Sequence, residues 1–408
     1  MPKYFYTAKS LTGKTKTGTK EAVDEYELAK TLRQQGLILI SAVLEEKNLK
    51  RKKINLIEIF QRFQRVSLTE RIMMIRNLQV MISAGVDLPR ALKILSLQTK
   101  NKRLTRVLTE IRENVMKGKS FSDALGAWPS IFPEMFSSMI KIGEEAGQLE
   151  EVLKTLSNQL EREYELKSKI KGAMMYPLVV VLAMVGIGIA MLVMVVPKLA
   201  ETFEELEIEL PLTTRIVINT GNFLIQKWYL IFGIIVFLIF LFRVLLKTKK
   251  GKKALDGFLF KVPLIAPLIK KINSAYTIRT FANLIKSGVP LVRSLEIISN
   301  SLDNFYFKES LISAQEKVQK GGKLSEALLP YQDLYSSTAI QMLEVGEETG
   351  ETSSILGKLA DFFEEEVTNT TKNLTAVIEP ILLLLVGGII GFFAISMVQP
   401  MYSMLGGI

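Results

Sequence analysis

Two short segments of the sequence hold paired carboxylates between glycines, an arrangement that can bind a divalent cation. They are Gly143-Glu144-Glu145-Ala146-Gly147 and Gly346-Glu347-Glu348-Thr349-Gly350. Calcium takes oxygen ligands of this kind, but its dedicated loops carry a dense, alternating run of them, which both segments lack. We therefore interpret the segments as interhelical turns shaped by their glycines. The carboxylates kept as weak metal candidates are Glu144, Glu145, Glu347 and Glu348.

A third segment, Lys117-Gly118-Lys119-Ser120, resembles the end of a nucleotide-binding P-loop. The P-loop spacing requires a glycine where this chain has Glu113, and no buried strand precedes it. A helix that ends at Gly118 and is followed by a Ser120 cap explains the same residues better. The chain also has no histidine and no cysteine, which removes imidazole bases, thiolate nucleophiles and most zinc and haem sites. We predict a protein that is not an enzyme and that needs no cofactor.

An ionisable residue lies near the start of one of the long apolar runs. Glu379-Pro380 begins the last run, and Tyr176-Pro177 takes the equivalent place in the first. A charge deep in lipid costs on the order of 2.5–3.5 kcal/mol, and snorkelling lowers that cost near the membrane surface. Two interpretations of Glu379 stay open, a role in coupling or assembly and a plain interfacial anchor. Each proline frees a carbonyl and kinks its helix, so both pairs are predicted to be articulations between a soluble domain and a span.

The sequence around these motifs occurs twice in the chain. Arg76–Ser96 aligns with Arg279–Ser299, so that Gly85 falls on Gly288, 203 residues further on and without a gap. Solenoid repeats have periods of roughly 20–50 residues, so this spacing indicates a duplicated domain. Apolar residues at helical spacing predict helices throughout each copy, with turns at the two glycines. We expect a mainly α fold built on tandem helical bundles.

Three apolar segments are long enough to cross a hydrocarbon core of ~30 Å. They cover residues 173–197, 228–246 and 377–399. Lys and Arg gather before the first span and after the second, whereas the segment between them is acidic, so the positive-inside rule places both bundles in the cytoplasm. The sequence predicts a multi-pass protein of the inner (cytoplasmic) membrane with a cytoplasmic N-terminus. Outside the membrane we expect an acidic loop at 198–227, with glutamates from Glu201 to Glu209, and a C-terminal stub at 400–408.

Glycines within the spans predict a close approach of helices in the membrane. Gly188 coincides with Gly391 across the repeat, and Gly387 lies one turn before Gly391. Small residues at such spacing let helix backbones pack closely, inside one chain or between chains, and a homo-oligomer is expected. The net charge of +11 suits an anionic membrane surface, and no nucleic-acid partner is expected.

The remaining residues divide into soluble parts around the spans. Residues 1–46 are predicted to form a small α+β unit, in which Asp24-x-x-Glu27 is a capping box that opens a helix between strands. Residues 47–66 are assigned to a basic linker and a first helix, for which a membrane-surface helix is the alternative. The two bundles are assigned to residues 67–172 and 247–376.

Together these features resemble a known family, the inner-membrane platform proteins of type IV pilus and type II secretion machines (PilC/GspF). The resemblance rests on Tyr6-Thr7-Ala8 followed by Gly13 and Gly18, on the Gly85 and Gly288 turns, and on Gly-Glu-x-x-Gly in both copies. The spans that begin at Tyr-Pro and Glu-Pro are also similar to the family pattern. The resemblance covers essentially the whole chain.

The resemblance implies a non-enzymatic scaffold that receives pilin or pseudopilin subunits from the membrane. Its implied partners are a cytoplasmic hexameric assembly ATPase, these subunits and other inner-membrane assembly proteins. One family member binds calcium in its first cytoplasmic domain, but no liganding set in this sequence is clear enough to carry that over. The alternative function, a multi-pass transporter or channel subunit, is disfavoured by three spans and by the absence of a broken helix with a polar midplane.

Overall fold

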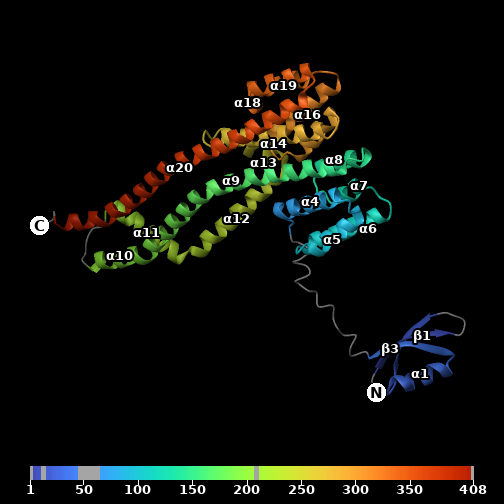
Figure 1. Cartoon of the computed structure of the whole chain (residues 1–408). Helices are drawn as coiled ribbons and strands as arrows, with labels where there is room; N and C mark the ends of the chain where they lie inside the picture. Colours follow the sequence, from blue (N-terminus) through green and yellow to red (C-terminus); the bar gives the residue numbers. More distant parts are fainter. Residues whose placement is uncertain (1–2, 11–14, 45–64, 206–210, 406–408) are drawn as a thin grey trace. The chain divides into compact units, whose positions relative to one another are not determined.

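The computed structural model describes residues 3–10, 15–44, 65–205 and 211–405 of the chain (Figure 1). The chain divides into two compact units, one with residues 1–65 and 100–103 and one with the remainder. The first unit contains a small α+β domain. The second contains the helical bundles and the long apolar helices.

The N-terminal domain is a three-stranded antiparallel sheet with one helix. Its elements are β1 (Lys3–Ser10), β2 (Thr15–Glu21), α1 (Glu25–Gln34) and β3 (Leu37–Leu44), and the strand order is β2-β1-β3. The side chain of Asp24 accepts a hydrogen bond from the backbone N–H of Glu27 and caps α1. Leu28 and Leu32 of α1 share a buried core with Tyr4 of β1. The predicted α+β unit is confirmed.

Copy 1 of the duplicated domain is helical throughout. Its helices are α4 (Leu68–Ser83), α5 (Leu88–Gln98), α6 (Lys102–Met116), α7 (Phe121–Gly126), α8 (Glu134–Glu145) and α9 (Leu149–Ala190). Ser67 and Glu70 form a full capping box at the start of α4, and Ser120 caps α7. The helix that ends before Gly118 and the Ser120 cap account for the segment that resembles a P-loop.

Copy 2 repeats this order with one small addition. Its helices are α14 (Ala266–Lys286), α15 (Leu291–Ser301), α16 (Phe305–Gln319), α17 (Leu324–Leu328), the 3-10 turn η2 (Leu329–Tyr331), α18 (Gln332–Tyr335), α19 (Ser337–Thr349) and α20 (Thr352–Leu405). One continuous apolar core joins the two copies, with Leu78, Phe136 and Leu156 from copy 1 and Phe281 and Phe307 from copy 2. The two bundles therefore form one packed body, because they share a core rather than a thin surface contact.

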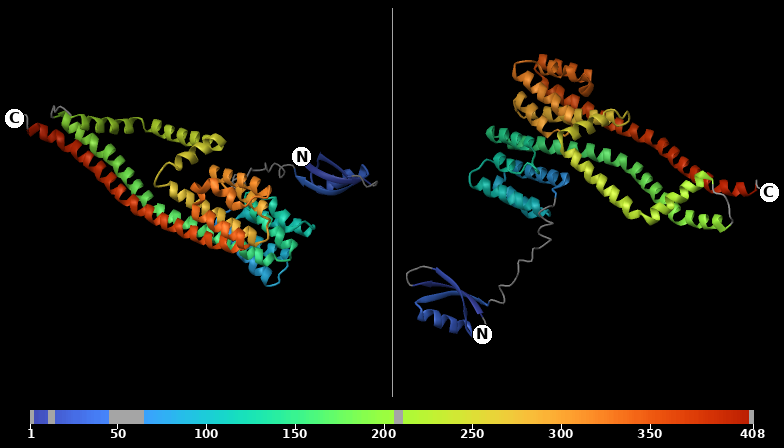
Figure 2. Two further views of the ribbon diagram at one scale, coloured as in Figure 1. Left: turned by 90° about the horizontal axis from the view of Figure 1, so that it is seen from above. Right: turned by 180° about the vertical axis from the view of Figure 1, so that it is seen from behind.

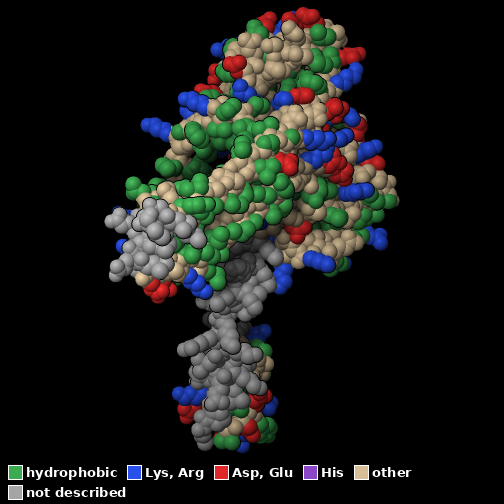
Figure 3. Space-filling model, turned by 90° about the vertical axis from the view of Figure 1, so that its left-hand side faces the viewer, with side chains coloured by type: hydrophobic (Ala, Val, Ile, Leu, Met, Phe, Trp, Pro, Cys, Tyr) green, Lys and Arg blue, Asp and Glu red, His purple; other side chains and the backbone are tan. Residues whose placement is uncertain are grey.

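Within the described residues, three helical stretches are long and apolar enough to cross a membrane. The first runs from Leu149 to Phe203 and joins α9, the π-helical turn η1 (Met191–Val195) and α10 (Val196–Glu205); the others are α12 (Trp228–Lys247) and Thr352–Pro400 of α20. Most of their apolar side chains are exposed, and Figure 3 shows hydrophobic side chains gathered over these helices. Exposed apolar surface of this extent is typical of lipid contact. α9 and α20 pack together and run away from the bundles side by side (Figures 1 and 2).

The segment predicted as an acidic outer loop contains two helices. α10 and α11 (Leu212–Gln226) occupy most of residues 198–227. Thr214 of α11 donates from its hydroxyl to the carbonyl of Ser396 in α20 at 2.5 Å, and Thr213 contacts Gln399 at 3.0 Å. The charge pattern of the sequence shows the acidic residues but does not predict α11, because the packing partner of α11 lies more than 180 residues away. Glu207 and Glu209, like most of the basic linker at 47–66, lie outside the described residues.

Candidate functional site

The first glutamate of each Gly-Glu-Glu motif caps a short helix that lies far away in the sequence. The carboxylate of Glu144 accepts hydrogen bonds from the backbone N–H groups of Phe121 at 2.6 Å and Ser122 at 2.9 Å, in the first turn of α7. In copy 2, Glu347 accepts from the N–H groups of Leu324 at 2.6 Å and Ser325 at 3.0 Å, at the start of α17. Such N–H groups have no partner inside the helix, and the positive end of the helix dipole favours a carboxylate. Both glutamates therefore tie one helix of the bundle to another.

The glycines of the same motifs let two helices meet at close range. A Cβ atom added at Gly143 would lie 2.8 Å from Cγ2 of Val152, and one added at Gly346 would lie 3.3 Å from Cα of Thr352. Gly147 and Gly350 have φ angles of +68° and +74°, a left-handed conformation that ends a helix and favours glycine. The glycines thus shape tight turns between α8 and α9 and between α19 and α20.

The four weak metal candidates do not converge on one point. The carboxylate oxygens of Glu144 and Glu347 accept hydrogen bonds from backbone N–H groups. Glu145 is exposed, and Glu348 forms an ion pair with Lys323 at 3.4 Å. Among the described residues, no group of three or more acidic side chains is placed to hold a metal ion. In this structure the motifs hold the helices of each bundle together, through the capped helix ends and the tight turns described above.

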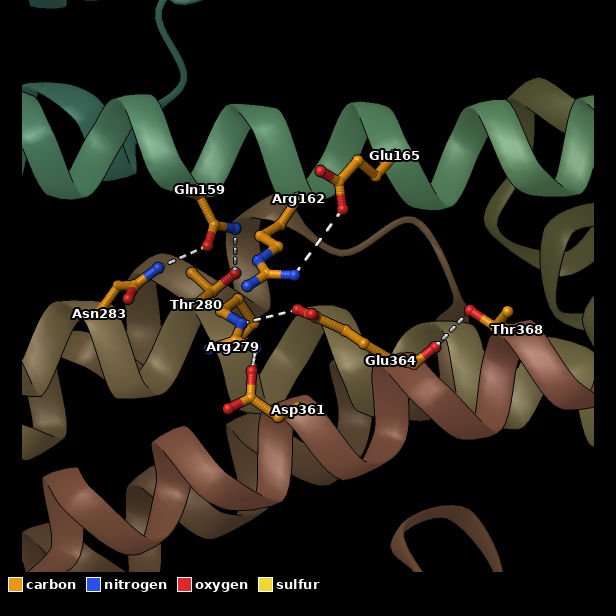
Figure 4. Close-up of polar contacts among 9 residues, drawn as sticks. All are labelled: Gln159, Arg162, Glu165, Arg279, Thr280, Asn283, Asp361, Glu364 and Thr368. Atoms are coloured by element: carbon orange, nitrogen blue, oxygen red, sulfur yellow. Dashed lines mark hydrogen bonds and ion pairs between the residues drawn. The ribbon is translucent and has the colours of Figure 1, made fainter.

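A buried polar cluster joins the two copies where α9 of copy 1 crosses α14 of copy 2 (Figure 4). The Gln159 side chain accepts a hydrogen bond from the Asn283 amide at 2.5 Å and contacts the Thr280 hydroxyl at 3.4 Å. Gln159 and Thr280 are buried. Buried polar groups of this kind favour one defined packing, because leaving an amide without its partner costs about 1–3 kcal/mol. Sequence periodicity gave no indication of this pair.

An arginine beside this cluster is held by two carboxylates of α20. Arg279 of α14 donates to Glu364 at 2.6 Å and also to Asp361 (Figure 4). Burial opposes the charge, but the hydrogen bonds to Glu364 and Asp361 outweigh it and raise the pKa of the Arg279 guanidinium. The equivalent pair in copy 1, Arg76 and Glu161, is 3.9 Å apart and more exposed. The repeated arginine therefore fastens the first helix of each copy to its last.

A second contact between the copies lies at the ends of α8 and α15. Glu134 of α8 accepts hydrogen bonds from Arg293 at 2.6 Å and from Asn300 at 3.3 Å, both on α15. Ile142 of α8 lies beside Gly288, 3.7 Å from the position of an added Cβ. Ion pairs this exposed contribute typically below about 1 kcal/mol. The contact therefore fixes how the bundles meet rather than how stable they are.

Both proline pairs lie inside continuous helices. Pro177 is within α9 and Pro380 is within α20, and neither helix is interrupted at its proline. The Tyr176 and Glu379 side chains are exposed, on the part of each helix that leaves the bundle. The roles of these residues as articulation, coupling group or anchor stay predictions.

The span glycines do not make tight contacts within the chain. A Cβ atom added at Gly188, Gly387 or Gly391 would meet nothing within 4 Å. Gly188 instead lines an apolar groove of about 330 Å³ between α9 and α20, together with Met191 and Phe393. The helix-packing role of these glycines, inside one chain or between chains, stays a prediction.

Comparison with known proteins identifies the duplicated domain. The model of the family "Type II secretion system (T2SS), protein F" matches residues 74–197 and again residues 277–400, which reproduces the repeat spacing. The model of the N-terminal domain of the same family matches residues 1–43. Both matches cover the parts of the chain described above.

Relatives from two kinds of machine match along essentially the full chain. The type IV pilus assembly protein PilC of Thermus thermophilus is 32% identical over 406 residues, 100% of this chain and 99% of that protein. PilC of Myxococcus xanthus is 30% identical over 405 residues, 99% of this chain and 95% of the relative. The type II secretion system protein F of Xanthomonas campestris is 30% identical over 410 residues, all of both chains. With its duplicated bundles, apolar helices and α+β domain, this chain belongs to the PilC/GspF family of type II secretion protein F and type IV pilus platform proteins.

Proposed function

We propose that the chain is a non-enzymatic platform of the inner membrane that couples a cytoplasmic assembly ATPase to the insertion of pilin or pseudopilin subunits into a filament. Family membership supports this, since the relatives are named for type IV pilus assembly and for type II secretion. Relatives from the two systems are about equally similar to this chain, since PilC of Thermus thermophilus is 32% identical and protein F of Xanthomonas campestris is 30% identical. The proposal therefore names the step that both systems share.

The observation that carries the proposal is the continuity between bundle and span. α20 is a single helix of 54 residues that starts in the bundle core and ends beyond the apolar segment, a length of about 80 Å at 1.5 Å per residue. α9 makes the same passage in copy 1. Because the bundles share one core and no loop separates them from the spans of α9 and α20, a rotation or shift of the bundles moves these two membrane helices with them. A coupling protein needs this rigidity.

Charge supports cytoplasmic bundles as the ATPase-binding part. Basic residues follow α12 in the short helix α13 (Lys249–Leu259), whereas α10 on the opposite side carries exposed Glu201 and Glu205. Lys and Arg mark the cytoplasmic side of a span, and ATP is held on that side. The outer segment faces the compartment where filament subunits leave, and its glutamates suit weak, salt-screened capture of a basic segment.

Site-directed photo-cross-linking in the native host tests the assignment. We expect a photoreactive residue at an exposed bundle position, such as Lys117 or Lys320, to cross-link to the ATPase in a panel of such positions. The same residue at Glu201 or Glu205 serves as the matched control and should give no ATPase product. ATPase products from the outer positions, or none from any bundle position, would contradict the proposal.

A further inference from the structure

The contact between the two bundles uses a different surface of each copy. Copy 1 contributes the α8–α9 face, defined by Glu134, Ile142 and Gln159. Copy 2 contributes the α14–α15 face, defined by Thr280, Asn283, Gly288 and Arg293, with Tyr276 one turn before Thr280 on the same side of α14. The repeat relates each face to a surface of the other copy. The α8–α9 face of copy 1 corresponds to the α19–α20 face of copy 2, which carries Ser337, Val345 and Phe362. The α14–α15 face of copy 2 corresponds to the α4–α5 face of copy 1, which carries Met73, Asn77, Val80, Gly85 and Arg90.

The two counterpart faces are open in the chain. Thr280 is 0% exposed and Gln159 is 3% exposed, whereas Met73 is 60%, Val80 is 56% and Phe362 is 49% exposed. Gly288 lies against Ile142, but a Cβ atom added at Gly85 would meet nothing within 4 Å, and Val345, the counterpart of Ile142, is also exposed. A contact between two different faces always leaves one of each kind unused, and such a contact can be repeated between chains.

The two open faces differ from the two faces in contact by the same exchange of residue type, from polar to apolar. Inside the chain an amide meets an amide, Gln159 with Asn283 (Figure 4). At the equivalent places the open faces carry Phe362 and Val80, both apolar. A single exposed apolar residue needs no explanation, but here both positions equivalent to an interacting polar pair are apolar. The two open faces are therefore matched in chemistry, since both are apolar where the closed faces are polar.

We propose that the α19–α20 face of one chain docks on the α4–α5 face of a second copy of this chain and repeats, head to tail, the contact between its own two bundles. α9 and α20 leave their bundles in the same direction (Figures 1 and 2). Successive chains that repeat this relation would keep all their spans in one membrane, as a head-to-tail contact between membrane proteins requires. The proposal goes beyond the platform function and does not depend on which ATPase or filament subunit is bound.

The proposed contact differs from the internal one in its charges. Arg293 is paired with Glu134 inside the chain, but the counterpart of Glu134 is Ser337, so Arg90 meets no carboxylate at that place. The contact between chains is therefore carried by Phe362, Val345, Met73 and Val80. Because apolar contacts are not screened by salt, its yield should not change with ionic strength.

The absence of cysteine makes a cross-linking test clean. Two differently tagged full-length chains, one with Phe362→Cys and one with Val80→Cys, are produced together and treated in native membranes with a short bis-maleimide. A single chain with Gln159→Cys and Asn283→Cys calibrates the internal contact. Met116→Cys, exposed at the end of α6, replaces Val80→Cys as the matched control. We expect products that carry both tags, at a yield about tenfold or more above the control, the ratio for a contact of about 1.4 kcal/mol.

The remaining outcomes decide against the proposal. Cross-links between two Val80→Cys chains would show that two α4–α5 faces contact each other, which contradicts a head-to-tail contact. A lysine-reactive cross-linker could trap oligomers that give no product between Phe362→Cys and Val80→Cys. That result would show that the chains associate through their spans and not through the proposed faces. Phe362→Glu should abolish the product, and Val80→Lys added to it should restore a product that now falls with salt. A Phe362→Glu variant with an unchanged level of oligomer would overturn the assignment without touching the platform function.

Discussion

At the scale of single residues, the acidic motifs act on helix ends rather than on a ligand. Glu144 and Glu347 each accept two backbone N–H groups from a helix that begins 22 to 23 residues earlier. The neighbouring glutamate of each motif points elsewhere, Glu145 to solvent and Glu348 to Lys323. The two adjacent glutamates of each motif therefore have different structural roles. Substituting them one at a time should change the stability of the protein by different amounts.

We expect Glu347→Ala to lower the free energy of unfolding by about 1–3 kcal/mol, because it leaves the N–H groups of Leu324 and Ser325 without an acceptor. Glu348→Ala is the matched control and should stay within about 0.5 kcal/mol. Thermal unfolding of the full-length protein in detergent, with calcium and with a chelator, measures both. A shift that disappeared in chelator for both variants would instead indicate a metal site.

At the scale of elements, α9 and α20 are the parts that connect the bundles to the membrane. Both pass through a proline without interruption, at Pro177 and Pro380. A proline removes one hydrogen bond and bends a helix, but neighbouring packing can keep the helix continuous. Glu379 lies next to Pro380 and is exposed, at the point where α20 leaves its bundle. This position suits a residue that passes movement from bundle to span.

We predict that Glu379→Gln keeps folding, membrane insertion and ATPase binding but lowers the rate of filament assembly, because it removes only the charge at this point. Filament yield per cell, measured with the level of the protein in the membrane, reports the effect. Glu365→Gln, exposed on the same helix inside the bundle, is the control and should assemble normally. Normal filament assembly by Glu379→Gln would support the interfacial-anchor interpretation.

At the scale of the whole molecule, the duplication is not symmetric in use. The two copies share one core, yet the polar contacts between them involve α8 and α9 from copy 1 and α14 and α15 from copy 2. The copies also enter the membrane differently, since copy 1 is followed by α10, α11 and a further span, α12, before copy 2 begins. The described residues hold three candidate spans, and the predicted orientation of the chain rests on the basic residues that flank them.

Single cysteines can report the orientation in this cysteine-free chain. We expect Thr202→Cys, on α10, to react with a membrane-impermeant maleimide in intact spheroplasts. Met116→Cys, on α6, should react only after the membrane is broken. The expectation follows from the basic residues that flank the spans on the bundle side. Labelling of Met116→Cys in intact spheroplasts would reverse the topology and with it the assigned ATPase side.

The duplication, the helical class, the three apolar spans and the N-terminal α+β unit could all be predicted from the amino-acid sequence. Each depends on local information: helical spacing around Leu78, a cap at Ser67, a turn glycine at Gly85, or an uninterrupted apolar run. The family resemblance also followed from such local patterns, and the matches to residues 74–197 and 277–400 confirmed it.

Which residues these elements bring together could be seen only in the folded chain. It placed Glu144 on the N-terminus of α7, Gln159 against Asn283, and α11 against the end of α20. These pairs are separated by 23, 124 and 182 residues, and no periodicity in a single sequence records such contacts. The physical reason is that helical spacing reports which face of a helix is buried, whereas the partner of that face is chosen by packing and hydrogen bonding across the folded chain.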